Sequence, residues 1–292
     1  MLNDDMKNFI SLALKEDLGS GDVTSESSVP ADLAQKGYIL AKENGVVAGV
    51  EVAREVFYQV NPEISFTAKI KDGSSVKFGD VVIELEGLAR DILTGERLAL
   101  NFMQRMSGIA TRTSEVVKSL EGTPTRVLDT RKTTPGLRAF EKQAVVMGGG
   151  VNHRMGLYDM ILLKDNHVDY AGSMTSAIEK VGQYLKDRSP ALQELPLVIE
   201  TRSFTEIEDA ISASVKSGIP IERILLDNFS PDKVSEAVER YSHLVSLEAS
   251  GGITPSNVRD YGEAGVDFVS MGYMTHSVKS LDLSLKSTPY VK

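Results

Sequence analysis

Six short apolar runs recur between residues 127 and 271, and helical stretches separate them. The runs are Val127-Leu128, Met160 to Leu163, Leu197 to Ile199, Ile224 to Leu226, Leu244 to Leu247 and Phe268 to Met271. Near-continuous apolar strands that alternate with helices predict a parallel sheet covered by helices. Six units are fewer than the eight of a complete barrel, so the pattern favours an incomplete α/β barrel. An open doubly wound sheet is the alternative.

The first part of the chain predicts a separate, strand-rich α+β module. The expected elements are helices at 4–17 and 50–60 and strands at 64–68 and 81–85. A long helical stretch, 89–120, then joins two domains, which we place at residues 1–110 and 111–278. Leucines alternate with polar residues near the C-terminus, so a strand within 279–292 is predicted to return to the first domain.

The acidic composition narrows the possible partners. The chain has 41 Asp and Glu against 32 Lys and Arg, a formal charge of -9, which argues against a surface for nucleic acid or anionic membrane. No apolar run is long enough to span a bilayer, and the N-terminal segment is acidic without a basic leader. The absence of Cys excludes disulfides and thiolate chemistry. We therefore expect a cytoplasmic protein.

One segment of this acidic chain, residues 126–167, is basic. It holds seven Lys and Arg against four Asp and Glu, a net charge of +3. Arg131 and Lys132 follow the first apolar run, and Lys164 follows the second. Because the carboxyl ends of barrel strands share one rim, these cations are predicted to converge on a multiply anionic small molecule.

Carboxylates follow the next two runs. Glu200 ends one of them and Asp227 ends the other. Such carboxylates can hold Mg²⁺, which prefers oxygen ligands and shares the phosphates of a substrate. Salt bridges to Lys or Arg on the same rim are the alternative for each residue.

A glycine-rich turn follows the fifth run. Ser250, Gly251 and Gly252 precede a helix start at Thr254-Pro255, and glycines there let backbone N–H groups approach an anion. The turn is either a phosphate cradle or only a tight strand-to-helix connection. Gly272, after the last run, favours the cradle because barrels often bind phosphate in their last two units.

The histidines lack the spacing of a zinc site such as HExxH, so a zinc site is excluded. His153 lies between three glycines and Arg154, and we expect it to hydrogen-bond an anionic ligand. Lys142, Arg138 and Arg126 are predicted to be solvated charges.

Long motifs also occur in a characteristic order along nearly the whole chain. They are EDLGSGDVTS (16–25), ERLALNFMQRMSGIAT (96–111), DTRKTTPGLR (129–138), GGGVNHR (148–154), KDNH (164–167), LLDNF (225–229) and EASGGI (248–253). These motifs resemble those of quinolinate phosphoribosyltransferase, also called nicotinate-nucleotide pyrophosphorylase (carboxylating). The resemblance implies an N-terminal α/β sandwich followed by an incomplete α/β barrel. It also implies that quinolinate and phosphoribosyl pyrophosphate give nicotinate mononucleotide, pyrophosphate and CO₂ in de novo NAD synthesis.

The resemblance further implies a Mg²⁺ cofactor, a homodimer in which Arg105 is contributed across the interface, and three groups of site residues. The expected quinolinate group is Arg105, Arg131, Lys132, His153, Arg154 and Lys164. The expected Mg²⁺ and phosphoribosyl group is Glu200 and Asp227, with the metal held through substrate or water. The expected 5′-phosphate group is Ser250, Gly251, Gly252, Gly272 and His276. The residues expected to be catalytic are Lys132, Lys164, Glu200 and Asp227.

Three features depart from the family pattern. Val198-Ile199-Glu200 stands where the family usually has E-V-E, extra residues lie around 212–221, and Tyr273-Met274 replaces a smaller Ala-Leu pair. None of them touches the basic segment. A nicotinate-type transferase, a relative from molybdenum transport and a non-catalytic phosphate-ligand sensor remain as alternatives, and a monocarboxylate substrate would need fewer cations.

Overall fold

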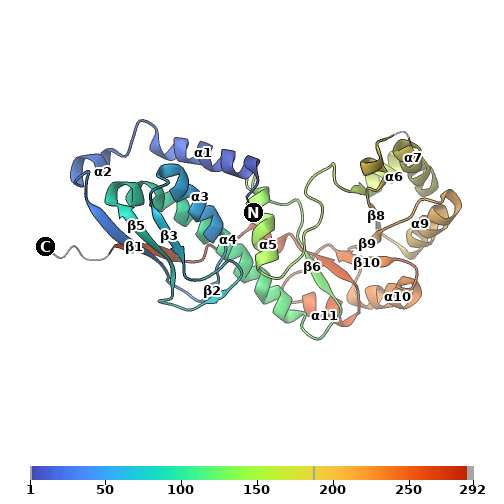
Figure 1. Cartoon of the computed structure of the whole chain (residues 1–292). Coiled ribbons are helices and arrows are strands. Elements are labelled where there is room, and N and C mark those ends of the chain that lie inside the picture. The colour runs from blue at the N-terminus through green and yellow to red at the C-terminus, as the bar shows by residue number, and fades with distance from the viewer. Residues whose placement is uncertain (1, 187, 288–292) are drawn as a thin grey trace. The chain divides into compact units, whose positions relative to one another are not determined.

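The computed structural model describes residues 2–186 and 188–287, and the chain divides into two compact units (Figure 1). The first unit comprises residues 1–115, 133–150 and 274–292, and the second comprises residues 116–132 and 151–273. Residues 133–150, which the sequence assigns to the barrel, therefore group with the first unit. Residues 288–292 of the predicted C-terminal strand lie outside the described part.

An antiparallel sheet with the strand order β12-β1-β5-β3 forms the centre of the first unit. Its strands are β1 (Ala34–Ala41), β3 (Ser65–Ala68), β5 (Val81–Leu88) and β12 (Leu283–Ser287), with a small second sheet of β2 (Gly45–Val46) and β4 (Ser75–Val76). Its helices are α1 (Asp4–Leu18), α2 (Val23–Ser28), α3 (Val50–Val60), α5 (Arg138–Met147) and most of α4 (Ala89–Ser119), whose residues from 116 onward group with the second unit. Ile39 of β1 pairs with Leu285 of β12, so the alternating leucines complete this sheet.

Six parallel strands form the second unit. They are β6 (Arg126–Leu128), β7 (Ile161–Leu163), β8 (Leu197–Thr201), β9 (Arg223–Asp227), β10 (Ser246–Ser250) and β11 (Phe268–Ser270). The helices that follow these strands are α6 (Asp165–Ala171), α7 (Met174–Lys186), α8 (Pro190–Gln193), α9 (Phe204–Ser217), α10 (Pro231–Tyr241), α11 (Val258–Glu263) and α12 (Tyr273–His276).

The strand order confirms the incomplete barrel. The order is β6-β11-β10-β9-β8-β7, so the last strand pairs with the first and the direction never reverses. A doubly wound sheet would reverse its order at a switch point. In the described residues β6 and β7 end the sheet without pairing to each other, which leaves the barrel open there.

Burial explains the apolar runs and corrects one boundary. Val198, Ile224 and Val269 are fully buried in the sheet, as expected for parallel strands covered on both faces. The fifth strand begins at Ser246 rather than at Leu244, because Leu244 is exposed and lies outside the sheet.

Lys142 is not a solvated charge, and that prediction is wrong. Phe140, Glu141 and Lys142 are all buried on α5. Three consecutive positions cover most of the circumference of a helix, so burial on α5 extends well beyond a single apolar face. Arg126, by contrast, is exposed as predicted, and Arg138 is half-buried.

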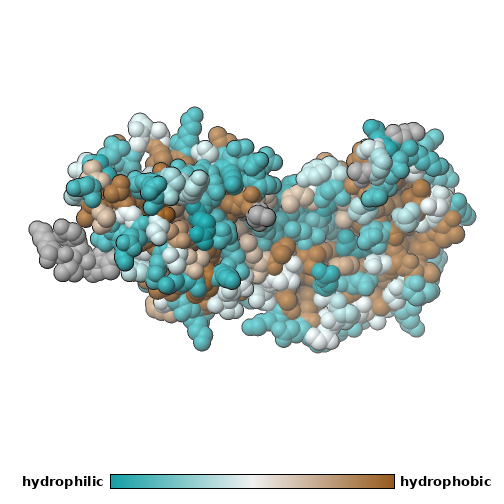
Figure 2. Space-filling view, in the orientation of Figure 1, coloured by the Kyte–Doolittle hydropathy of each residue, from teal (hydrophilic) through white to brown (hydrophobic). Residues whose placement is uncertain are grey.

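The visible surface is mainly hydrophilic, with scattered hydrophobic patches (Figure 2). None of the described helices has the length and apolar character needed to cross a membrane.

Candidate active site

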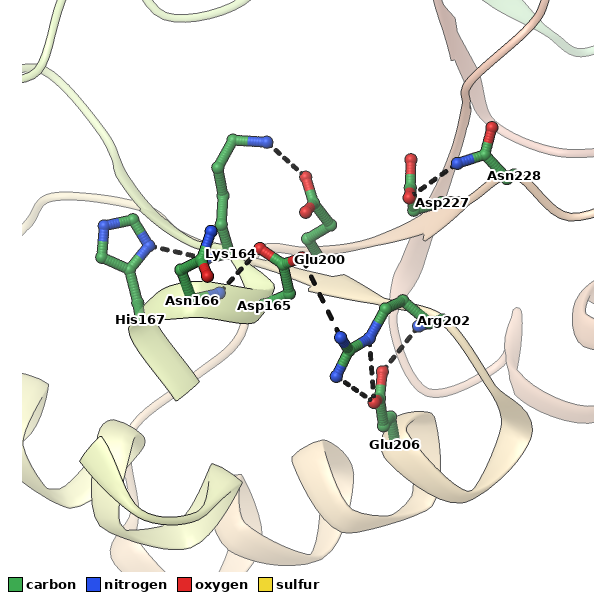
Figure 3. A network of polar contacts seen from close by, with 9 residues as sticks. All are labelled: Lys164, Asp165, Asn166, His167, Glu200, Arg202, Glu206, Asp227 and Asn228. Atoms are coloured by element: carbon green, nitrogen blue, oxygen red, sulfur yellow. Dashed lines mark hydrogen bonds and ion pairs between the residues drawn. The ribbon is translucent and has the colours of Figure 1, made fainter. Parts of the chain in front are cut away.

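The carboxyl ends of the barrel strands bring Lys164 and Glu200 together. Leu163 of β7 is in register with Ile199 of β8, so the residues that follow them are neighbours at the rim. Lys164 Nζ lies 2.5 Å from Glu200 Oε2 (Figure 3). The Glu200 side chain is 11% exposed and that of Lys164 is 43% exposed. The salt bridge that was the alternative for Glu200 is therefore present, at an edge that a ligand could reach.

Asp227 ends the neighbouring strand, β9, beside the glycine turn. It is in register with Ser250, the last residue of β10. Its Oδ2 accepts a hydrogen bond of 2.8 Å from Asn228 Nδ2 (Figure 3). The order of the strands thus places Lys164, Glu200, Asp227 and Ser250 at the carboxyl ends of four consecutive strands.

The glycine turn has a conformation that requires glycine. Gly251 has φ of 93° and Gly252 has φ of 63°, both in the left-handed region that L side chains disfavour. Asn257 closes the turn, accepting from Thr254 N at 2.7 Å and donating to Gly252 O at 3.2 Å. This geometry accounts for a tight connection, and binding of phosphate by the turn stays a prediction.

Arg154 is a buried cation close to a second cation. Its relative exposure is 8%, and its Nη1 donates a long hydrogen bond of 3.5 Å to Met160 O. Burial lowers the pKa of Arg154, the charge of Arg131 lowers it further, and Asp159 opposes both effects. Since the protein itself disfavours the positive charge at this position, an anionic ligand would relieve the cost.

The ring nitrogens of His153 both face partners within the protein. Nδ1 accepts from the Arg154 backbone N–H at 2.7 Å, and Nε2 lies 3.5 Å from Glu248 Oε2. The His153 backbone N–H donates to Asp129 Oδ1 at 2.8 Å, and Asp129 is fully buried. These contacts fix the segment that carries Arg154, whereas the predicted hydrogen bond from His153 to a ligand stays a prediction.

Glu248 is a fully buried carboxylate beneath the rim. Its Oε2 lies 3.2 Å from Arg223 Nε, an ion pair whose alignment does not complete a hydrogen bond. Burial pushes the pKa of Glu248 up, but His153, Arg223 and Ser270 outweigh it and hold the pKa below its ordinary value of 4.5. Glu248 is therefore ionised in the core of the second unit.

Replacing Glu248 with alanine is expected to lower the free energy of unfolding by about 3–5 kcal/mol, because Arg223 loses its buried counter-charge. The charge of Glu248 contributes its full stabilisation at pH values above the pKa that Glu248 has in the unfolded chain. This stabilisation is lost as the pH falls through the lower pKa that Glu248 has in the folded protein. Glu248→Gln should therefore be destabilised near pH 7, and its deficit should shrink below about pH 4.5. Denaturant unfolding of wild type and variant at both pH values measures this, and a deficit that is independent of pH would contradict it.

The other predicted site residues fall in both units. Lys132 is exposed and follows β6, and Gly272 follows β11 in the second unit. Arg105 and His276 belong to the first unit. His276 is exposed and its Nδ1 lies 2.6 Å from Ser277 Oγ.

Arg105 has a defined set of partners within the first unit. Its Nε and Nη2 donate to Glu141 Oε1 at 2.8 and 2.6 Å, and Nη2 also donates to Thr134 Oγ1 at 2.6 Å. Glu141 Oε2 accepts from Thr134 N at 3.2 Å. One edge of the Arg105 guanidinium is thus held by buried Glu141.

Sequence reasoning missed Glu141 and Asn228 as candidates for functional roles. Asn228 lies in the LLDNF motif (225–229) and Glu141 between two of the other motifs, but neither has a pattern that assigns a role. For Asn228 one signal was available, an Asn directly after a strand-end Asp, because Asn tolerates left-handed backbone at the end of a strand.

Val198 shows what replaces the missing carboxylate of the E-V-E pattern. It lies two residues before Glu200 and on the same face of β8, but it is fully buried. A carboxylate at this depth would need a buried partner. Val198 instead packs in the apolar core.

The carboxylates fit a metal held mainly by substrate. No group of three or more His, Cys, Asp or Glu in the described chain could hold a metal ion by itself. Glu200 and Asp227, on adjacent strands, supply the one or two carboxylates with which Mg²⁺ is usually bound beside phosphate groups.

Comparison with known proteins gives one consistent family. The family models for the N-terminal and C-terminal domains of quinolinate phosphoribosyl transferase match residues 22–107 and 109–286. The chain is 42% identical to a chloroplastic nicotinate-nucleotide pyrophosphorylase [carboxylating] of Arabidopsis thaliana, covering 97% of this chain and 82% of that protein. It is 38% identical to a probable nicotinate-nucleotide pyrophosphorylase [carboxylating] of Bacillus subtilis, covering 97% and 93%. The solved structure of the nicotinate-nucleotide pyrophosphorylase from Francisella tularensis is similar with a TM-score of 0.90 and 35% identity, over 99% and 98% of the two chains.

Proposed function

The chain belongs to the quinolinate phosphoribosyltransferase family, and from that premise we propose how the rim of its barrel carries out the reaction. It is a decarboxylating phosphoribosyltransferase of de novo NAD synthesis. Quinolinate and phosphoribosyl pyrophosphate are converted to nicotinate mononucleotide, pyrophosphate and CO₂. The division of this work among residues is the proposal.

The observation that carries the proposal is the cationic environment of Arg154. Quinolinate has two adjacent carboxylates and a charge of about -2 at neutral pH. The positive charge of Arg131 helps to lower the pKa of buried Arg154, and fork-shaped guanidinium groups bind carboxylates bidentately. We assign the two carboxylates to Arg131 and Arg154, with Lys132 as an additional point charge.

Lys164, Glu200 and Asp227 face the phosphoribosyl substrate in this proposal. Bound Mg²⁺, held by Glu200 and Asp227 with substrate phosphates, would neutralise charge on the pyrophosphate. Lys164 adds a positive charge where the leaving group becomes more negative. Glu200 keeps the Lys164 ammonium in place through their 2.5 Å contact.

Positioning then determines the order of bond changes. The C1–O bond to pyrophosphate breaks, and the pyridine nitrogen donates its electron pair to the ribose carbon, which has oxocarbenium character. The carboxylate next to the quaternised nitrogen leaves as CO₂, its electron pair stays on the ring carbon, and a proton from solvent completes the product. No covalent enzyme nucleophile is needed, because the residues act by orientation and charge.

The activity is tested by incubating the protein with quinolinate and phosphoribosyl pyrophosphate and measuring the release of pyrophosphate and CO₂. Nicotinate in place of quinolinate is the control substrate. We expect one CO₂ for each pyrophosphate from quinolinate and no CO₂ from nicotinate. Equal turnover of nicotinate would indicate a nicotinate-type transferase. Binding of phosphoribosyl pyrophosphate without turnover would indicate a sensor.

We further propose a homodimer in which Arg105 serves the site of the partner subunit. Arg105→Ala and Lys164→Ala are each expected to be nearly inactive. When the two variants are combined and their subunits exchange at random, half of the dimers contain one subunit of each variant. Each of these dimers has one intact site out of two, so about a quarter of wild-type activity should return. No recovery, with exchange verified by mass, would contradict a contribution of Arg105 across the dimer.

Location in the cytoplasm stays a prediction, since the Arabidopsis relative is named chloroplastic.

A further inference from the structure

Asn228 has an unusual backbone conformation beside the proposed phosphoribosyl site. Its φ is 57°, and it is the single residue other than glycine with positive φ in residues 2–186 and 188–287. Residues with a side chain seldom adopt this backbone, although Asn tolerates it better than most, and such residues cluster at functional sites. The contacts of Asn228 therefore indicate its role.

Three contacts hold Asn228 between two parts of the rim. Its backbone N–H donates to Ser250 O at 2.8 Å, and its side-chain Nδ2 donates to Asp227 Oδ2 at 2.8 Å. Its Oδ1 faces Gly251 so closely that a Cβ on this glycine would lie 2.2 Å from it. One short side chain thus contacts both the strand-end carboxylate (Figure 3) and the glycine turn.

We propose that Asn228 is a positioning residue for the phosphoribosyl end of the substrate. Its amide holds Oδ2 of Asp227, so that the carboxylate keeps one orientation before substrate binds. Its carbonyl side packs against Gly251 and fixes the shape of the turn from Ser250 to Gly252. This inference rests on the proposed function, in which Asp227 and the turn bind phosphoribosyl pyrophosphate.

Glycine at position 228 separates this role from a backbone role. Glycine adopts φ of 57° without steric cost, so Asn228→Gly removes the side-chain contacts and keeps the backbone conformation. Asn228→Ala removes the same contacts and also strains the backbone, so it serves as the comparison for folding.

The expected effect of Asn228→Gly is selective for one substrate. Loss of a hydrogen bond to a charged group should raise KM for phosphoribosyl pyrophosphate about 10-fold to 100-fold. KM for quinolinate should stay within about twofold, since the quinolinate carboxylates are assigned to other strands. Ribose 5-phosphate, titrated by calorimetry without Mg²⁺ or quinolinate, should bind more weakly by a similar factor, which gives a readout independent of turnover.

A double-mutant cycle with Gly251 tests the contact itself. Gly251→Ala places a Cβ against the Asn228 side chain and also strains φ of 93°. In the Asn228→Gly background the side-chain clash is absent, although the backbone nitrogen of residue 228 remains 3.0 Å from the Cβ position. Gly251→Ala should therefore weaken ribose 5-phosphate binding less in that background than in wild type.

Wild-type ribose 5-phosphate affinity in Asn228→Gly, or an equal rise of both KM values, would overturn the inference. Additive effects in the cycle would also overturn the contact between Asn228 and Gly251. Failure of the proposed function is distinguishable, because wild type would then release no pyrophosphate from quinolinate and phosphoribosyl pyrophosphate.

Discussion

Replacing Lys164 with alanine is expected to lower kcat/KM by about 10³-fold, because a positive charge is lost where pyrophosphate departs. The structure places Lys164 in direct contact with Glu200. Steady-state kinetics with both substrates measures the loss. Lys180→Ala is the matched control, since Lys180 is exposed on α7 and its Nζ donates to the Ala171 carbonyl at 3.3 Å.

A second variant separates catalysis from stability at this position. Lys164→Ala leaves the mostly buried Glu200 without its partner, so some stability is lost. Combining it with Glu200→Gln removes the uncompensated charge and should restore the melting temperature but not the activity. Recovery of activity in the double variant, or near-normal kcat/KM in Lys164→Ala, would show that this pair is only a salt bridge.

Replacing Arg131 with alanine is expected to raise KM for quinolinate about 10²-fold while leaving the melting temperature nearly unchanged, because Arg131 is exposed. The loss follows from the removal of a charge-assisted contact to a carboxylate.

Arg126→Ala is the matched control, because Arg126 begins strand β6 and Arg131 follows its other end. The two arginines thus flank the same strand, one at its first residue and one three residues beyond its last. Kinetics and thermal unfolding of both variants should differ only in the quinolinate KM. A normal quinolinate KM in Arg131→Ala, or an equal defect in Arg126→Ala, would remove Arg131 from the site.

The rim of the barrel could be predicted from the sequence, because a residue's place on the rim depends only on its position directly after a parallel strand. Residues that follow consecutive strands reach the same edge, so the proximity of Lys164 and Glu200 follows from the pairing of Leu163 with Ile199. The incomplete closure follows in the same way from the number of apolar runs.

The remaining features depend on contacts between distant residues. The apolar positions of α5 predict one buried face and do not reveal that Lys142 on another face is also covered. The environment of His153, which lies outside the strands, depends on Glu248 of β10. The conformation of Asn228 depends on Gly251, a contact that no periodicity encodes.

The most direct test of the account is a crystal structure of the protein with quinolinate bound. We predict that the two carboxylates lie within hydrogen-bond distance of the Arg131 and Arg154 guanidinium groups, at the rim that carries Lys164 and Asp227. Quinolinate bound away from this rim, or with its carboxylates on neither arginine, would contradict the assignment.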